Sequence, residues 1–217
     1  MPNPETIRNL EQSVIDGDTD RAENLARQVL KEKIDIQMAI DEGLIKGIKQ
    51  VGDAFGNGEA FLPDLIMSGE AMKIASDILE EELQKSGAEI KSAGGKLVIG
   101  TVAGDIHDIG KTLVATLFKG AGFQVIDLGV DVPREKFIEA VNENKPDIIG
   151  LSSLLTSSAG EQKLIMEALQ DAGLRSEVKV MVGGGAISEK WAHDIGADAY
   201  GGDAWEAVEA GSKLMDV

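Results

Sequence analysis

The segment GDIHDIGKT, residues 104–112, holds the side chains whose types and spacing are best suited to chemistry. His107 is one of only two histidines, the other being His193, so a zinc site built from several histidines is excluded. Asp105 lies two residues before His107 and is able to hold one ring nitrogen while the other faces a ligand. From these residues alone, a tuned metal ligand and an ordinary turn histidine are equally good interpretations.

The same segment also has a nucleotide-binding interpretation, because Gly110-Lys111-Thr112 ends like a phosphate-binding loop. The pattern G-x-x-x-x-G-K-[ST] requires glycine at position 105, where this chain has aspartate. Asp105 and Asp108 would in addition repel a triphosphate. The sequence therefore disfavours a nucleotide site.

Composition narrows the partners and the class of protein. The 217 residues include 21 Lys and Arg against 38 Asp and Glu, for a formal charge of -17, which disfavours nucleic acid and anionic membranes as partners. The absence of cysteine excludes disulfides, thiolate metal sites and cysteine nucleophiles. We find neither an apolar signal core nor a run of about 18 apolar residues, so we expect a cytoplasmic protein without a membrane span.

Up to about residue 88 the apolar residues recur at helical spacing, which predicts a bundle of four amphipathic helices. Asp35 is expected to cap the third helix and Pro63 to open the fourth. The predicted stripes are Ile7, Leu10 and Val14; Leu25, Val29 and Leu30; Ile40, Leu44, Ile48, Val51 and Phe55; and Ile66, Ala71, Ala75, Ile78 and Leu79. Residues 1–88 are thus predicted to form a helical domain, followed by a linker at 89–95.

After the linker, short apolar runs alternate with helical segments. The runs at 97–102, 123–129, 147–152, 178–184 and 198–202 predict strands, with helices starting near Ile109, Pro133, Gly160, Ser188 and Ala204. Such alternation predicts an α/β domain over 96–217, with a five-stranded parallel sheet wound on both faces, as in flavodoxin or Rossmann folds.

The unusual loops all follow predicted strands, where parallel sheets bind their ligands. They read GDIHDIG, SSLLTSS, GGGAIS and GGDAW. Glycine at such turns lets a bulky ligand approach the backbone, and the Ser and Thr side chains supply neutral hydrogen-bonding groups.

Three of these loops share a pattern: Asp105-x-His107-x-x-Gly110, then Ser152-x-Leu154, then Gly183-Gly184. In order and position this resembles the D-x-H-x-x-G … S-x-L … G-G signature of B12-binding modules. The resemblance implies a corrinoid cofactor with His107 as the cobalt ligand, Asp105 bonded to His107, and Ser158 extending that relay. It also implies a pocket for the displaced nucleotide tail, lined by Ser152, Leu154, Thr156, Gly183 and Gly184. The remaining expected cofactor contacts are Gly104, Ile106, Asp108, Gly110 and Ala204.

The helical half refines the resemblance. The stretch VGDAFGNGEAFLPDLIMSGEAMK, residues 51–73, resembles the helical cap of cobalamin-dependent methionine synthase and of corrinoid proteins in methyltransferase systems. In that cap an aromatic residue and a leucine cover the methyl-bearing face of the corrin, which implies these roles for Phe55 and Leu62, with Leu65 nearby. The alternative is that all three residues belong to the helical core.

The resemblance covers nearly the whole chain and implies a small methyl carrier rather than a complete enzyme. Such a carrier cycles between methylcobalamin and cob(I)alamin, and serves a substrate:corrinoid methyltransferase for methylamine, betaine, methanol or methoxyl groups. A second methyltransferase then passes the methyl to a thiol or folate, and a reductive activase is a possible further partner. A B12-based sensor and an adenosylcobalamin mutase subunit are alternatives. The mutase normally lacks this cap, and a sensor should carry a DNA-binding or signalling region.

Overall fold

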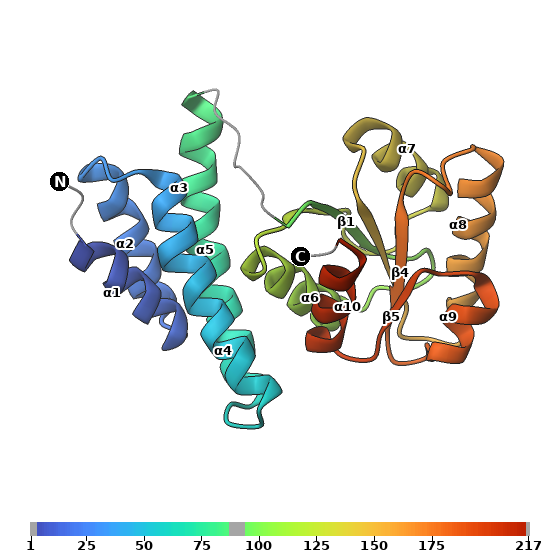
Figure 1. Ribbon diagram of the computed structural model, residues 1–217, viewed down its shortest axis with the longest axis horizontal. Helices are drawn as coiled ribbons and strands as arrows, with labels where there is room; N and C mark the ends of the chain where they lie inside the picture. Colours follow the sequence, from blue (N-terminus) through green and yellow to red (C-terminus); the bar gives the residue numbers. More distant parts are fainter. Residues whose placement is uncertain (1–3, 87–93, 216–217) are drawn as a thin grey trace. The chain divides into compact units, whose positions relative to one another are not determined.

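The computed structural model describes residues 4–86 and 94–215, which separate into a helical unit and an α/β unit (Figure 1). The helical unit comprises the described residues before position 94 together with Lys119–Gly122. The α/β unit comprises the rest of the described chain. Most of the predicted linker, residues 89–93, lies outside the described residues.

The helical unit is built from α1 (Pro4–Ile15), α2 (Thr19–Lys31), α3 (Ile36–Ala39), the π-helical segment η1 (Ile40–Ile45), α4 (Lys46–Gly56) and α5 (Leu62–Ser86). The junctions of α3, η1 and α4 keep right-handed helical backbone, so these three segments form one continuous helix. The predicted four helices are therefore confirmed, and the π-helical segment within the third is a feature that the apolar spacing did not reveal.

Local capping fixes where these helices begin. The Asp35 carboxylate accepts a hydrogen bond from the Met38 N–H at 2.8 Å, as predicted, and the Asp64 carboxylate accepts one from the Phe61 N–H at 2.8 Å. The predicted stripes then supply the core, since Leu10, Val14, Val29, Leu44, Ile48, Ala71, Ala75 and Leu79 are fully buried. Burial of these aliphatic side chains, rather than helix propensity, holds the unit together.

The α/β unit alternates strands with helices along the chain. Its elements are β1 (Lys96–Thr101), α6 (Ile109–Gly120), β2 (Gln124–Asp127), α7 (Arg134–Asn144), β3 (Ile148–Ser152), α8 (Ala159–Asp171), β4 (Lys179–Gly183), α9 (Glu189–Ile195), β5 (Ala199–Gly201) and α10 (Ala204–Leu214). All strand pairs are parallel and the order is β2-β1-β3-β4-β5, which confirms the predicted flavodoxin-like sheet.

Alternating side chains of the strands pack on both faces of this sheet. Ile149 and Leu151 of β3 face a cluster with Phe137 of α7 and Ile165 of α8. Ile148, which directly precedes Ile149, points to the other face and joins a cluster on α6 and α10. Figure 1 shows α8 and α9 on the side of the sheet opposite to α6 and α10. Because the chain leaves β1 for one neighbour and returns to β3 on the other side, strand order reverses between β1 and β3, where such sheets bind ligands.

Within the described residues, every helix is too short or too polar to cross a membrane.

Candidate functional site

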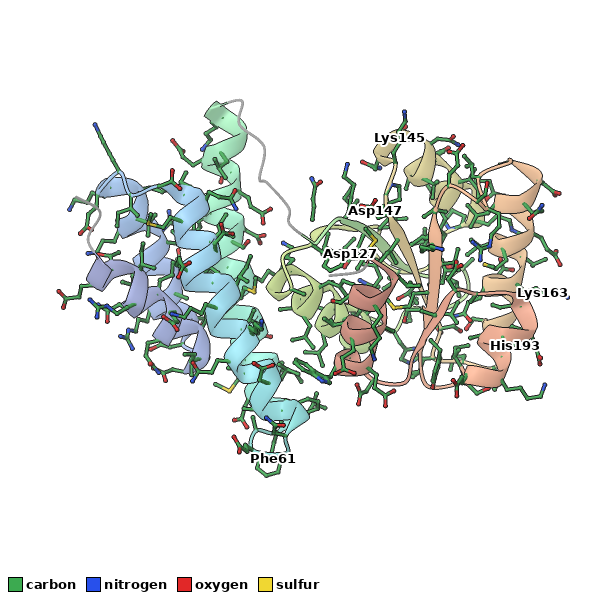
Figure 2. All side chains as sticks on the ribbon, viewed as in Figure 1. Phe61, Asp127, Lys145, Asp147, Lys163 and His193 are labelled. Carbon is green, nitrogen blue, oxygen red and sulfur yellow. The ribbon has the colours of Figure 1, made fainter. Side chains whose placement is uncertain are left out.

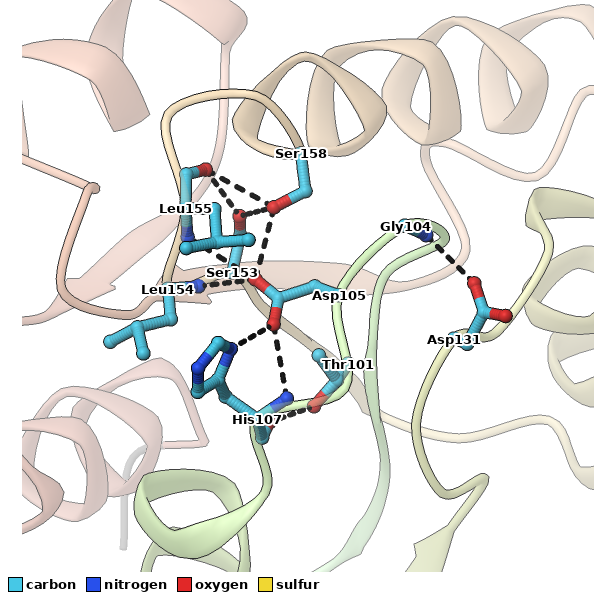
Figure 3. A network of polar contacts seen from close by, with 9 residues as sticks. All are labelled: Thr101, Gly104, Asp105, His107, Asp131, Ser153, Leu154, Leu155 and Ser158. Carbon is cyan, nitrogen blue, oxygen red and sulfur yellow. Dashed lines mark hydrogen bonds and ion pairs between the residues drawn. The ribbon is translucent and has the colours of Figure 1, made fainter.

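The loop after β1 holds Asp105 as a completely buried carboxylate. One of its oxygens accepts the N–H of His107 at 3.0 Å and the His107 Nδ1 at 2.7 Å. Its other oxygen accepts the N–H groups of Leu154 and Leu155 at 2.7 and 3.2 Å and the Ser158 hydroxyl at 2.9 Å (Figure 3). Asp105 therefore joins the loop after β1 to the loop after β3, across the point where strand order reverses.

These hydrogen bonds determine the charge of Asp105. Burial by itself would raise the pKa of this carboxyl group, because it penalises the charged form. The donors from His107, Leu154 and Ser158 outweigh burial and hold the pKa below its usual value. Asp105 is consequently a carboxylate at neutral pH, and it acts only as an acceptor.

The charge of Asp105 in turn sets the tautomer of His107. Since the carboxylate can only accept, Nδ1 must carry the proton, and Nε2 of the neutral ring keeps its lone pair. The side chain is 50% exposed, and Nε2 has no hydrogen-bond partner among the described residues. The Thr101 hydroxyl donates to the His107 carbonyl at 2.9 Å and fixes the backbone beneath the ring. His107 thus presents one oriented donor atom to the outside.

Ser158 continues the network as the sequence analysis anticipated, and Ser153 adds a member that it missed. Both hydroxyls are buried and lie 2.9 Å apart. Ser158 occupies the N-cap position of α8, yet its side chain does not cap the helix and bonds Asp105 instead. Ser153 follows the last residue of β3 in the serine-rich loop, which was the signal available for it.

The two glycines of the signature let the loops after β3, β4 and β5 approach one another. Gly184 has a φ of +119°, and a Cβ built there would lie 2.0 Å from the Ser153 carbonyl oxygen. A Cβ at Gly183 would lie 2.8 Å from the Gly201 carbonyl oxygen. Ser153 also donates its N–H to the Gly183 carbonyl at 3.0 Å. No larger residue fits at Gly184 without moving this loop.

A buried glutamine, which the sequence analysis did not single out, supports the same loops. Gln162 of α8 is fully buried and donates to the Leu151 carbonyl at 2.9 Å. Its side-chain oxygen accepts the Trp191 indole N–H at 3.0 Å. A glutamine on an otherwise ordinary helical face gives no sequence signal for this role.

The other predicted residues of the α/β unit differ in their exposure. Ile106 is 73% exposed, and Ile109, Leu154 and Leu155 are exposed as well. Such exposed aliphatic side chains mark a ligand surface when they gather beside a polar centre. Gly104, Asp108, Gly110 and Thr156 are exposed, Ser152 is half-buried at the end of β3, and Ala204 is buried at the start of α10. His193 projects from α9 into solvent, apart from this network (Figure 2).

The three predicted residues of the helical unit lie in three different environments. Leu62 is 47% exposed at the start of α5, Phe55 is half-buried near the end of α4, and Leu65 is fully buried. Leu65 therefore belongs to the helical core in this structure. Phe61, which the sequence analysis did not select, is the most exposed large apolar side chain at this tip of the unit (Figure 2).

The residues around His107 fit a corrinoid. A single imidazole donor suits a metal that brings its other ligands with it, as cobalt does in a corrin ring. Among the residues that the structure describes, no group of three or more His, Cys, Asp or Glu side chains is placed to hold a bare metal ion. The exposed aliphatic side chains beside the ring suit the apolar face of a macrocycle.

Comparison with protein families agrees with this geometry. Two models described as B12 binding domains match the chain, one over residues 95–210 and the other over residues 6–80. The fold and the site thus define a B12-binding protein with a helical and an α/β module.

Curated relatives narrow the class further. The chain is 46% identical over 209 residues to a corrinoid protein of Desulfitobacterium hafniense, covering 96% of this chain and 97% of that protein. It is 42% identical over 213 residues to the trimethylamine corrinoid protein of Methanosarcina barkeri, covering 98% of each. The chain belongs to the family of small corrinoid proteins found in methyltransferase systems, and its cofactor is a corrinoid.

Solved structures share the fold. A cobalamin-binding protein from Desulfitobacterium hafniense has 32% identity and a TM-score of 0.68, with 96% of this chain and 98% of that chain covered. The methanol:cobalamin methyltransferase complex of Methanosarcina barkeri contains a chain with 28% identity and a TM-score of 0.84, with 99% of this chain and 81% of that chain covered.

Proposed function

We propose that this chain binds a corrinoid through Nε2 of His107 and carries a methyl group on the cobalt between two partner methyltransferases. The observation that carries the proposal is the Asp105–His107 pair, in which a buried carboxylate holds the proton on Nδ1 and leaves Nε2 as an oriented donor. When bound, the corrinoid would supply the methyl-carrying chemistry, and His107 would hold it.

The remaining predicted residues are proposed to bind the corrinoid and to orient it. We assign the nucleotide tail of the corrinoid to the ends of β3 and β4 and the loops that follow them, where Ser152, Leu154, Thr156, Gly183 and Gly184 lie. Gly104, Ile106, Asp108, Gly110 and Ala204 complete the proposed contacts of the α/β unit. On the helical unit, exposed Leu62 and half-buried Phe55 are assigned to the methyl-bearing face, where apolar side chains exclude water.

Asp105 and Ser158 are proposed to act through His107. The Asp105 carboxylate keeps the Nδ1 proton in place, and Ser158 and the two backbone N–H groups hold the carboxylate. The relay would therefore hold the His107 ring in the tautomer and orientation that direct Nε2 towards the metal.

The chain is proposed to be a carrier subunit that depends on separate enzymes. A substrate:corrinoid methyltransferase of the methylamine, betaine, methanol or methoxyl class would load it, and a thiol- or folate-dependent methyltransferase would unload it, with a reductive activase as a further partner. The relatives described above are named as corrinoid proteins, and these names do not support the alternative of a B12-based sensor.

Labelled methyl groups test the carrier function. The protein is reconstituted with hydroxocobalamin, reduced with titanium(III) citrate, treated with [¹⁴C]iodomethane and separated from small molecules. We expect about one label per chain, released by light as a cobalt–carbon bond requires, and discharged to a thiol when the unloading methyltransferase of a corrinoid system is added. His193→Ala should behave like the wild type, because His193 is exposed on α9. Label that survives illumination, or no bound label, would contradict the proposal.

A further inference from the structure

A second set of contacts reaches the His107 segment from the loop after β2. The Thr101 N–H donates to the Gly129 carbonyl at 3.0 Å, and the Val132 N–H donates to the Thr101 carbonyl at 3.0 Å. Val102 and Val132 form a further parallel bridge. Residues 129–132 therefore run beside the end of β1, immediately before the turn that leads to His107. None of these contacts uses the Asp105 carboxylate.

Asp131 holds two consecutive residues of that turn. Its carboxylate accepts the Gly104 N–H at 2.7 Å (Figure 3), and its own N–H donates to the Asp105 carbonyl at 2.9 Å. Asp131 has a φ of +52°, which is unusual for a residue other than glycine. Such a backbone persists only where the surroundings enforce it, and these conformations gather at functional sites.

The far end of the His107 segment is tied to the same loop. Lys111, in the first turn of α6, is buried and forms an ion pair with Asp127, the last residue of β2. The second oxygen of Asp127 accepts the Gly129 N–H at 2.9 Å. Residues 127–131 therefore hold the segment 104–111 at both ends, from outside the Asp105–Ser158 network.

We propose that Asp131 is a positioning residue for His107, supported by the Lys111–Asp127 pair. The inference rests on the proposed function, since it concerns the ligand that would lie beneath the metal. Asp105 fixes the tautomer of the ring and joins the His107 segment to the loop after β3. Asp131 holds the backbone of the same segment from the loop after β2, at Gly104 and Asp105, and so helps to fix where Nε2 lies.

Two substitutions of Asp131 distinguish the role of its carboxylate from that of its positive φ. Asp131→Gly tolerates the positive φ and removes the acceptor for Gly104, whereas Asp131→Asn tolerates this φ and keeps an acceptor oxygen. Asp147→Gly is the matched control, because the Asp147 carboxylate also accepts a backbone N–H, that of Lys96 at 2.8 Å, but before β3 rather than beside the His107 loop. Each protein is labelled with [¹⁵N]histidine, loaded with cobalamin and reduced to the Co(II) form.

Electron paramagnetic resonance then gives the ratio of histidine-bound to histidine-free cobalt. We expect this ratio to fall about tenfold in Asp131→Gly, the lower end of effects for residues behind a metal ligand. It should return to the wild-type value in Asp131→Asn and stay there in Asp147→Gly. In the corrinoid-free Asp131→Gly protein, nitrogen-15 chemical shifts should still show the proton on Nδ1 of His107, because Asp105 is unchanged.

The outcomes separate this inference from the proposed function. A wild-type protein without coupling to a histidine nitrogen would contradict the proposed function itself. Wild-type coupling that Asp131→Gly leaves unchanged would overturn the role of Asp131, as would a folded Asp131→Gly protein that binds no corrinoid. An Asp131→Asn protein that behaves like Asp131→Gly, or an equal fall in Asp147→Gly, would overturn it too. If Asp131→Gly does not fold, hydrogen exchange in the wild type decides, because the Gly104 amide should be protected and rapid exchange would refute the contact.

Discussion

The loop that carries His107 and the tip of the helical unit illustrate two kinds of functional residue. Asp105, His107 and Ser158 are joined by hydrogen bonds that centre on the buried Asp105 carboxylate. Phe55, Leu62 and Leu65 share no such contact, and they range from exposed to fully buried. A polar side chain reveals its role through the partner that burial obliges it to have, whereas an apolar side chain serves a core or a ligand equally well.

The largest expected effect on stability comes from comparing the two leucines of the helical tip, Leu65 and Leu62. Leu65→Ala should lower the free energy of unfolding by about 4 kcal/mol, because a fully buried leucine leaves a cavity. Leu62→Ala should change it by less than about 0.5 kcal/mol, because an exposed side chain leaves none. Urea denaturation of the corrinoid-free proteins measures both. Similar losses for the two variants would mean that Leu62 is a core residue and would remove it from the proposed cofactor surface.

Substitution of Gly184, in the turn after β4, should have the next largest effect on the free energy of unfolding. Gly184→Ala should cost about 3 kcal/mol, because its Cβ would collide with the Ser153 carbonyl oxygen and its φ is +119°. Gly173→Ala is the control, since Gly173 has a φ of +73° but open space around it, so only the backbone cost of about 1 kcal/mol remains. Equal losses in urea denaturation would show that the close approach of the two loops is not needed.

Asp105→Asn should cost about 2 kcal/mol in the corrinoid-free protein. An amide keeps one acceptor oxygen, so its NH₂ group must face either the two His107 donors or the donors from Leu154, Leu155 and Ser158. Asp108→Asn, in the same loop but exposed, is the control and should be neutral. A neutral effect at Asp105 would contradict the view that its burial requires these partners.

The low pKa of Asp105 makes the stability difference between the wild type and Asp105→Asn depend on pH. A carboxyl group whose pKa is lowered by folding stabilises the protein above its unfolded-state pKa of about 3.9, and this stabilisation is lost as the pH falls towards the folded-state value. The stability difference between the wild type and Asp105→Asn should therefore shrink between pH 5 and pH 3. A constant difference would argue against an ionised, hydrogen-bonded Asp105.

The serine pair should give the smallest effect. Ser158→Ala removes one of the donors to Asp105 and should cost about 1 kcal/mol, because the backbone donors remain. Ser153→Ala should have a smaller effect on the redox potential of the bound cobalamin, since Ser153 reaches Asp105 only through Ser158. Redox titration of the cobalamin-loaded proteins separates them: Ser158→Ala should shift the Co(II)/Co(I) potential more than Ser153→Ala. The reverse order would mean that the relay does not run through Ser158.

The same contrast explains what could be predicted from the sequence. Strand bounds agreed with the apolar runs to within one or two residues, because the central strands β1, β3 and β4 are buried and nearly continuously apolar. Asp105 and Ser158 were found through a known signature. Ser153 was missed although it lies in the serine-rich loop, because the signature selects its neighbours Ser152 and Leu154. Asp131 was missed because its role depends on the Gly104 N–H, a backbone group that no side-chain pattern encodes. The π-helical segment at Ile40–Ile45 likewise leaves the apolar spacing intact.

The most direct test of the account is the identity of the nitrogen that binds cobalt. The protein is loaded with cobalamin, reduced to the Co(II) form, and prepared twice, with natural-abundance and with [¹⁵N]histidine. The account predicts that paramagnetic resonance shows coupling to one nitrogen, that the splitting changes from three lines to two on labelling, and that His107→Ala loses it while His193→Ala keeps it. Coupling that does not respond to labelled histidine, and so comes from the benzimidazole of the cofactor, would contradict the account.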